Sequence, residues 1–159
     1  MTPDQKIEAL GLTLPAPLSL PADIKIPFSW VRIVGNRAVV SGHIPVNNDG
    51  SVYHQLGKVG STISIEQGYQ AARQTGLAIL GSLQRELGTL NTISAWVRAF
   101  GMVNTAPGFN QTFLVMNGFS DVILEVFGKE IGDHCRSAVG MAELPMNVPV
   151  EIEVEVALK

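Results

Sequence analysis

The sequence predicts a single two-layer α+β domain in which two long helices cover one face of a mixed β-sheet. Two segments with helical spacing of apolar residues are each flanked by strand-like runs, which gives the order β-β-α-β-α-β-β. The chain has 159 residues and is 46% hydrophobic, so it can bury one core of the usual domain size.

The N-terminal segment, residues 1–27, is predicted to be a short helix followed by a connector. Thr2 begins a capping-box pattern with proline at the first helical position, so a helix should span residues 3–10. Residues 13–27 contain four prolines, which favours an extended chain over a regular element. We therefore place the domain proper at residues 28–159.

The domain should open with a β-hairpin and continue into a long helix. Residues 28–34 and 37–42 have the composition of short strands, and Gly35-Asn36 between them is typical of a tight turn. Across residues 65–87 the apolar and small side chains recur at helical spacing, which predicts a long amphipathic helix.

A strand, a second helix and two further strands are predicted to complete the domain. Residues 92–100 alternate with the period of a strand, with Trp96 on the polar side. A second helical pattern covers residues 113–128, begins with an inward-facing phenylalanine and ends at a glycine. The chain closes with strand-like runs at residues 135–144 and 148–157.

The composition predicts association with another protein chain rather than with nucleic acid. Right-handed crossovers would place both helices on the same face of the sheet, which leaves the opposite face for a partner subunit to cover. Charged residues make up 16% of the chain, below the roughly 25% typical of soluble domains. The net charge is −3 and no basic run could follow a phosphate backbone.

The cysteine and histidines predict neither a disulfide nor a metal site. Cys135 is the only cysteine; alternation turns it away from the neighbouring arginine, and we expect a buried, unreactive thiol. His43, His54 and His134 lack the spacing of metal ligands, and no cofactor-binding motif occurs. Without a leader pattern or a long apolar stretch, we expect a cytoplasmic protein that needs no cofactor and contacts no membrane.

Arg136 is the side chain best suited to bind a ligand. Alternation along its strand puts Ala138 and Gly140 on the same face, so a planar fork of donors lies beside small residues. Such an arrangement fits a carboxylate or a phosphate, and Ala138 would line the site. The alternative is a cross-strand ion pair between Arg136 and Glu151, and the pattern favours neither.

The last strand has one apolar and one acidic face. Its valines and isoleucine should meet the helices, while Glu151, Glu153 and Glu155 point the other way. These glutamates are either a solvated face or, for Glu151, part of the ligand site.

The segment RSAVGMAELPMNVPVEIEVEVA, residues 136–157, resembles the C-terminal signature of the reactive intermediate deaminase family, also called YjgF/YER057c/UK114 proteins. SGHIPV at residues 41–46, together with Gly35-Asn36 and Asn117, matches further family positions. The form HCRSAVG and the N-terminal extension are similar to a longer subgroup labelled endoribonuclease or chorismate-mutase-like.

The resemblance implies a chorismate-mutase-like fold and a homotrimer whose sheets face a central barrel, with ligand clefts between subunits. Arg136 matches the arginine that binds the substrate carboxylate, and Glu151 matches the acidic residue near the attacking water. Ser41 and Asn117 match other pocket positions. Phe28 stands where many members have a tyrosine.

The implied activity is hydrolysis of small reactive enamine or imine acids to 2-keto acids and ammonia. The partner would then be a small carboxylate-bearing metabolite, and no cofactor is required. One alternative is a binding protein without turnover, which the missing phenol at Phe28 favours. Another is the endoribonuclease or translation inhibitor for which some relatives are named, although the acidic balance of the chain argues against RNA.

Overall fold

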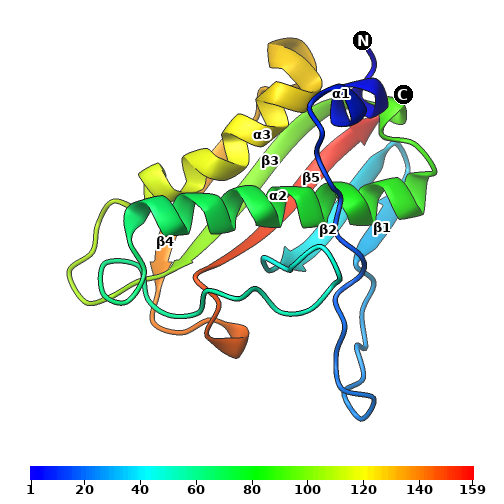
Figure 1. Ribbon diagram of the computed structural model, residues 1–159. Coiled ribbons are helices and arrows are strands. Elements are labelled where there is room, and N and C mark those ends of the chain that lie inside the picture. The colour runs from blue at the N-terminus through cyan, green and yellow to red at the C-terminus, as the bar shows by residue number, and fades with distance from the viewer.

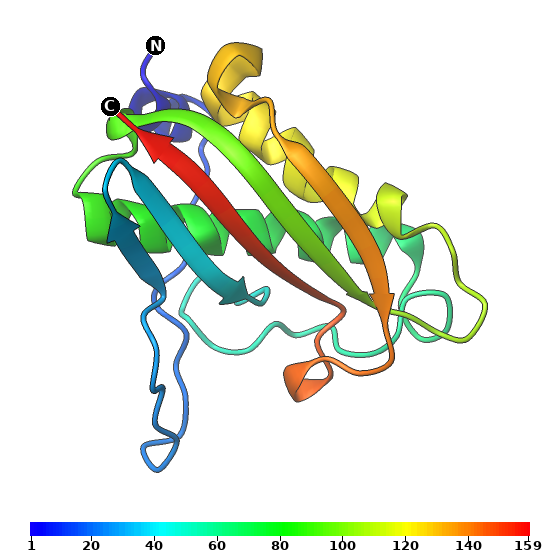
Figure 2. The same cartoon turned by 180° about the vertical axis from the view of Figure 1, so that it is seen from behind.

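The protein, described here over residues 1–159 by a computed structural model, is built in two layers (Figure 1). Helices α2 (Ile65–Leu87) and α3 (Thr112–Gly132) lie across one face of a five-stranded sheet. Seen from behind, the other face of the sheet carries no helix (Figure 2). The predicted fold class, with both long helices on one side of the sheet, is therefore confirmed.

The sheet is mixed, and its strands lie in the order β1-β2-β5-β3-β4. Only β3 and β4 are parallel, and the other neighbours are antiparallel. The first strand begins three positions later than predicted, and the third continues past residue 100 because it pairs along both of its edges. The strand bounds are β1 Val31–Val34, β2 Arg37–His43, β3 Ile93–Asn104, β4 Cys135–Met141 and β5 Val150–Leu158.

The last two strands are consecutive in the chain but are not neighbours in the sheet. β5 inserts between β2 and β3, so Ala99 of β3 pairs with Arg136 on one side and with Val154 on the other. The helical crossover through α3 brings β4 to the outer edge of β3, and the inner edge of β3 remains for β5. The predicted alternative of a cross-strand Arg136–Glu151 pair is therefore wrong.

Local capping signals set the helix ends. In α1 (Pro3–Ala9) the predicted capping box forms, with Thr2 and Gln5 exchanging hydrogen bonds. Helix α2 has the predicted bounds because a second capping box opens it and left-handed Gly88 ends it. In α3 the predicted end, Gly128, has φ 70° and breaks the helical geometry, but one more turn follows.

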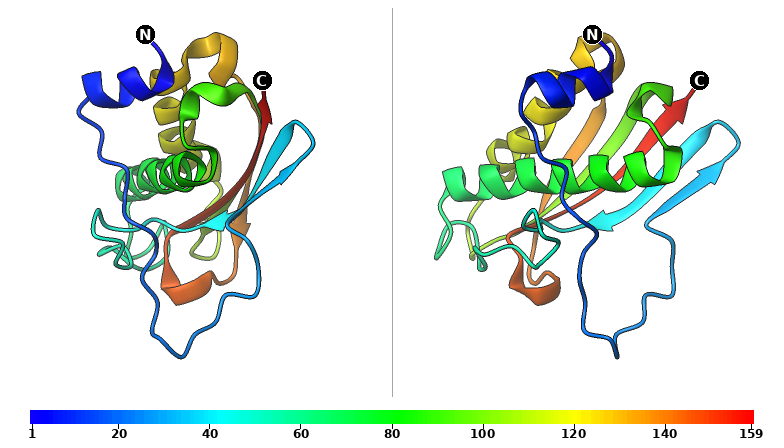
Figure 3. Two further views of the ribbon diagram at one scale, coloured as in Figure 1. Left: turned by 90° about the vertical axis from the view of Figure 1, so that its right-hand side faces the viewer. Right: turned by 45° about the vertical axis from the view of Figure 1, so that its right-hand side comes forward.

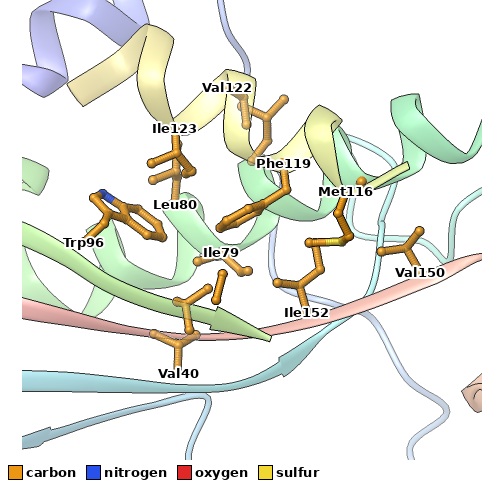
Figure 4. Close-up of a cluster of buried hydrophobic side chains, with 14 of the residues drawn as sticks. Val40, Ile79, Leu80, Trp96, Met116, Phe119, Val122, Ile123, Val150 and Ile152 are labelled. Atoms are coloured by element: carbon orange, nitrogen blue, oxygen red, sulfur yellow. The ribbon is translucent and has the colours of Figure 1, made fainter. Parts of the chain in front are cut away.

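The core fills the space between the helices and the sheet (Figure 4). The apolar residues of β5 face the helices as predicted, and Ile152 is fully buried. Trp96, predicted on the polar face of its strand, is instead 3% exposed and packs edge-on against Phe119 and Phe127. Two β-bulges in β3 shift the alternation and turn this ring inward. Phe113, predicted to face inward, is 52% exposed at the start of α3.

The connector runs as an extended chain across α2, as the prolines predicted (Figure 3). The backbone of Ala16 donates to the Asn48 carbonyl at 3.0 Å, and Ser19 donates to the Gly50 carbonyl at 2.9 Å. Arg85 of α2 donates to the Pro15 carbonyl at 3.1 Å. None of the helices has the combined length and apolarity required to cross a membrane.

Candidate functional site

The guanidinium of Arg136 is held against the side of α3. Arg136 lies on the edge strand β4, on the face that the helices cover, because it shares that face with buried Ala99. Its Nη1 donates to Asn117 Oδ1 at 3.2 Å and to Ser120 Oγ at 2.9 Å, and its Nη2 donates to the Phe113 carbonyl at 3.2 Å. Acceptors from successive turns of one helix thus fix the plane of the fork.

This cation has no acidic partner. The three salt bridges of the chain join Arg37 to Glu155, Lys58 to Glu143 and Arg73 to Glu125. The side chain of Arg136 is half-buried; burial lowers its pKa, and nearby Asp121 partly opposes that shift. Arginine remains charged at neutral pH, so a fixed and uncompensated positive charge stands at the sheet edge.

A chain of hydrogen bonds continues from Arg136 to a histidine. Ser120 Oγ lies 3.0 Å from His134 Nε2, and His134 Nδ1 lies 2.7 Å from the Gly132 carbonyl. The carbonyl can only accept, so Nδ1 carries a proton, and the Ser120 hydroxyl, which accepts from Arg136, is hydrogen-bonded to Nε2. Ser120 was missed by the sequence reasoning, although it follows Asn117 by one helical turn and shares its face.

Glu151 lies on the opposite, uncovered face of the sheet, packed over Gly42. A Cβ atom at Gly42 would collide with Glu151 Oε1, so a larger residue there would move this carboxylate from its present position. Burial raises the pKa of Glu151, and the charge of Glu153 adds to the shift. Beside this pair, Ser41 Oγ donates to the Ser29 carbonyl at 2.7 Å.

The predicted site residues therefore form two separate groups. Arg136 and Asn117 meet in a hydrogen bond, and Ala138 follows Arg136 on the same face, its carbonyl accepting from Thr112 Oγ1 at 3.0 Å. Ser41 and Glu151 belong to the other group. Arg136 and Glu151 lie on opposite faces of the sheet with β3 between them, so one chain does not bring them together.

Two sequence expectations about the surroundings change. Cys135, predicted to be buried, is exposed because it points to the uncovered face of an edge strand. The space predicted at Gly140 is occupied by Thr105, whose Oγ1 would lie 2.8 Å from an added Cβ atom. Phe28 is half-exposed and packs edge-on against Trp30 with ring centroids 5.1 Å apart. No three histidine, cysteine or acidic side chains lie close enough to hold a metal ion.

Comparison with known proteins agrees with this architecture. Residues 4–154 match the model of the family described as "YjgF/chorismate_mutase-like, putative endoribonuclease". The chain belongs to this family. It is 36% identical over 154 residues to protein TCP17 of Trypanosoma cruzi, and the aligned residues cover 96% of this chain and 91% of TCP17.

Two crystal structures of proteins similar in length to this one superpose on nearly the whole chain. Atu1372 from Agrobacterium tumefaciens is 33% identical with a TM-score of 0.86, covering 99% of this chain and 92% of that protein. A protein from Shewanella oneidensis, titled "a putative endoribonuclease", is 26% identical with a TM-score of 0.87, covering 99% of this chain and 100% of that protein. The N-terminal helix and connector are thus within the shared structure.

Proposed function

We propose that the protein hydrolyses small enamine or imine acids to 2-keto acids and ammonia, in sites that two copies of the chain form together. The observation that carries the proposal is the fixed guanidinium of Arg136, which has only uncharged acceptors and no acidic partner. A carboxylate offers this fork a negative charge, which its present contacts lack. It also offers two oxygens to the N–H donors that those contacts leave unused.

Glu151 would supply the base for the hydrolytic step. With the substrate carboxylate on Arg136, a water oxygen attacks the imine carbon, its proton passes to Glu151, and the C=N electron pair moves to nitrogen. Glu151 returns that proton to the nitrogen, which gives a carbinolamine. It then takes the proton of the new hydroxyl and passes it to the amino nitrogen, so that the C–N bond breaks, ammonia leaves, and the C=O bond of the 2-keto acid forms. A carboxyl group whose pKa is raised by burial is better suited to this exchange near neutral pH than an exposed one.

A second copy of the chain would join the two groups of residues. The uncovered sheet face carries Phe100, Met102 and Val39, and Val39 is 47% exposed. Burying this face among copies, in the homotrimer with a central barrel that the family resemblance implies, would remove apolar surface from water. The edge strand that carries Arg136 would then be free to approach Glu151 of a neighbour.

The deciding experiment measures hydrolysis directly. Imines released from serine or threonine by a dehydratase should disappear faster when the purified protein is added, with 2-keto acid formed in equal amount. If imine decay is unchanged while pyruvate still raises the melting temperature, the protein is a carboxylate-binding protein without turnover, as the missing phenol at Phe28 favours. Because the net charge is −3, we expect no cleavage of single-stranded RNA in parallel samples.

Ser120 is a positioning residue for Arg136, and its removal should affect substrate binding. In Ser120→Ala the guanidinium loses one of its three acceptors but still contacts the substrate directly, so we expect KM to rise about 5- to 10-fold, with kcat within about twofold. Steady-state kinetics measure both constants. Ser120→Thr keeps the hydroxyl and should restore most of the affinity; equal KM values for alanine and wild type would exclude this role.

A further inference from the structure

A cavity of about 480 Å³ lies away from Arg136, between the connector, α2 and the first hairpin. Pro17 of the connector forms one wall, Phe28 and Trp30 form a second, and Ser82 and Arg85 of α2 form a third. A volume of this size is within the range of small-molecule sites. None of the residues around Arg136 contributes to it.

The lining of the cavity includes a second arginine without an acidic partner. Arg85 Nη2 donates to Ser82 Oγ at 3.1 Å, and Nη1 donates to the Pro15 carbonyl. Arg85 is absent from the salt bridges of the chain, and Glu86, which also lines the cavity, does not pair with it. The fork is therefore fixed by neutral acceptors, and its charge is uncompensated.

A buried histidine continues the hydrogen-bond chain from Arg85. His43 is 6% exposed, its Nε2 lies 2.8 Å from Ser82 Oγ and its Nδ1 lies 2.7 Å from the Ser41 carbonyl. Burial, and to a lesser extent the charge of Arg85, lowers the pKa of His43, so the ring is neutral at pH 7. Its Nδ1 donates to the carbonyl, and Nε2 accepts from Ser82.

The same order of groups occurs at Arg136. In both places an arginine without a counterion donates to a serine on a helix, the serine is hydrogen-bonded to a histidine, and the histidine donates to a backbone carbonyl two residues before it. The serine hydroxyl contacts both the guanidinium and the imidazole. The guanidinium is thus held in place without being neutralised, which leaves it available to an anion.

The wall of the cavity formed by Phe28 and Trp30 is apolar and aromatic. The ring of Trp30 packs edge-on against Phe28 and against His43, with centroid distances of 5.1 Å in both cases. A flat apolar group could pack against this wall while an attached anion reaches Arg85. The carboxylate of Glu86 on the cavity lining disfavours a doubly charged phosphate, so a single negative charge fits best.

We propose that this cavity is a second ligand site, specific for a monocarboxylate with an aromatic or flat apolar body, whose carboxylate binds Arg85 and whose body packs against Trp30. This site uses neither Arg136 nor Glu151 of the proposed hydrolytic site, so the two can be tested separately; Phe28 is the one predicted pocket residue that also lines this cavity. Its occupant would also contact the connector, which Arg85 anchors to α2.

Titration with phenylacetate tests the proposal. The protein has two tryptophans, and Trp96 is buried in the core, so a change in tryptophan emission on binding reports on Trp30. We expect saturable binding of phenylacetate that changes this emission, and at least tenfold weaker binding of the neutral analogue phenylacetamide. Equal binding of the two probes by wild-type protein, or no binding of phenylacetate, would overturn the proposal without any variant.

Variants then locate the charge that binds the probe. Arg85→Gln should weaken phenylacetate binding at least tenfold, whereas Arg136→Gln should leave it within twofold. Because Arg85 also anchors the connector, Arg85→Lys serves as a second variant that keeps the charge and a donor, and we expect a smaller loss. The site is refuted if Arg136→Gln, and not Arg85→Gln, removes the binding.

Discussion

Arg136→Gln should lower kcat/KM for imine hydrolysis by about 100-fold or more, the largest single effect that we expect on activity. A carboxylate on the guanidinium accepts two charge-assisted hydrogen bonds, each contributing about 1.5–3 kcal/mol. Glutamine can replace at most one donor and carries no charge. The measurement is the rate of 2-keto acid formation in the dehydratase-coupled assay, at substrate concentrations below KM.

The matched controls separate the site from a general loss of charge. Arg73→Gln removes an arginine from the helix layer that is already paired with Glu125, and surface pairs contribute little, so activity should stay within twofold. Arg136→Lys keeps the charge but loses the planar fork, and it should recover only part of the activity. Wild-type kcat/KM in Arg136→Gln would remove the basis of the proposed function.

The melting temperature of Arg136→Gln should change little. The acceptors on α3 are uncharged, and the arginine is only half-buried, so no buried charge is left without its partner. A large loss of activity with a nearly unchanged melting temperature would therefore report on binding. This distinguishes Arg136 from a residue that holds β4 on α3.

Features set by neighbouring residues in the chain could be predicted from the sequence. The bounds of α2 follow from the capping box at Ser64 and the left-handed glycine at position 88, both of which act within one turn. The inward face of β5 follows from strict alternation with no bulge at Ile152 or Val154. In β3 two bulges, which the local pattern does not mark, reverse the side on which Trp96 lies.

Features set by the placing of whole elements could not be predicted in this way. The position of β5 between β2 and β3 depends on which strand edges remain free after α3 has formed its crossover. The same holds for the candidate sites. Arg136 stands out in the sequence as a lone cation among small residues, but its contact with Ser120 exists only once α3 lies on β4. Similarly, Ser82 meets His43 only through packing of α2 on the sheet.

Glu151→Gln should lower kcat by about 100-fold or more while leaving binding of the product pyruvate nearly unchanged. Glutamine fills the same space over Gly42 but cannot take a proton from water. In the wild type, kcat should fall as the pH drops through the raised pKa of Glu151, and this acidic limb should lie above the pKa of about 4.3 of an exposed glutamate. The pH profile and the pyruvate affinity are the two measurements.

The stability of Glu151→Gln provides a control, because the substitution should lower activity without lowering stability at neutral pH. The pKa of Glu151 is higher in the folded than in the unfolded chain, so ionisation costs stability as the pH rises from about 4.3 to the raised value. Glutamine has no such cost. Above that pH range Glu151→Gln should be at least as stable as the wild type, and the advantage should disappear at lower pH. A marked fall in melting temperature at neutral pH would contradict this account of Glu151.

Mixing the two inactive variants tests whether the groups meet between subunits. When Arg136→Gln and Glu151→Gln chains are unfolded and refolded together in equal amounts, a site shared by two chains receives both native residues in about a quarter of cases. Roughly that fraction of wild-type activity should return. A site within a single chain would recover nothing, because each variant chain lacks one of the two residues. The regained fraction therefore measures the architecture of the site and its chemistry in one experiment.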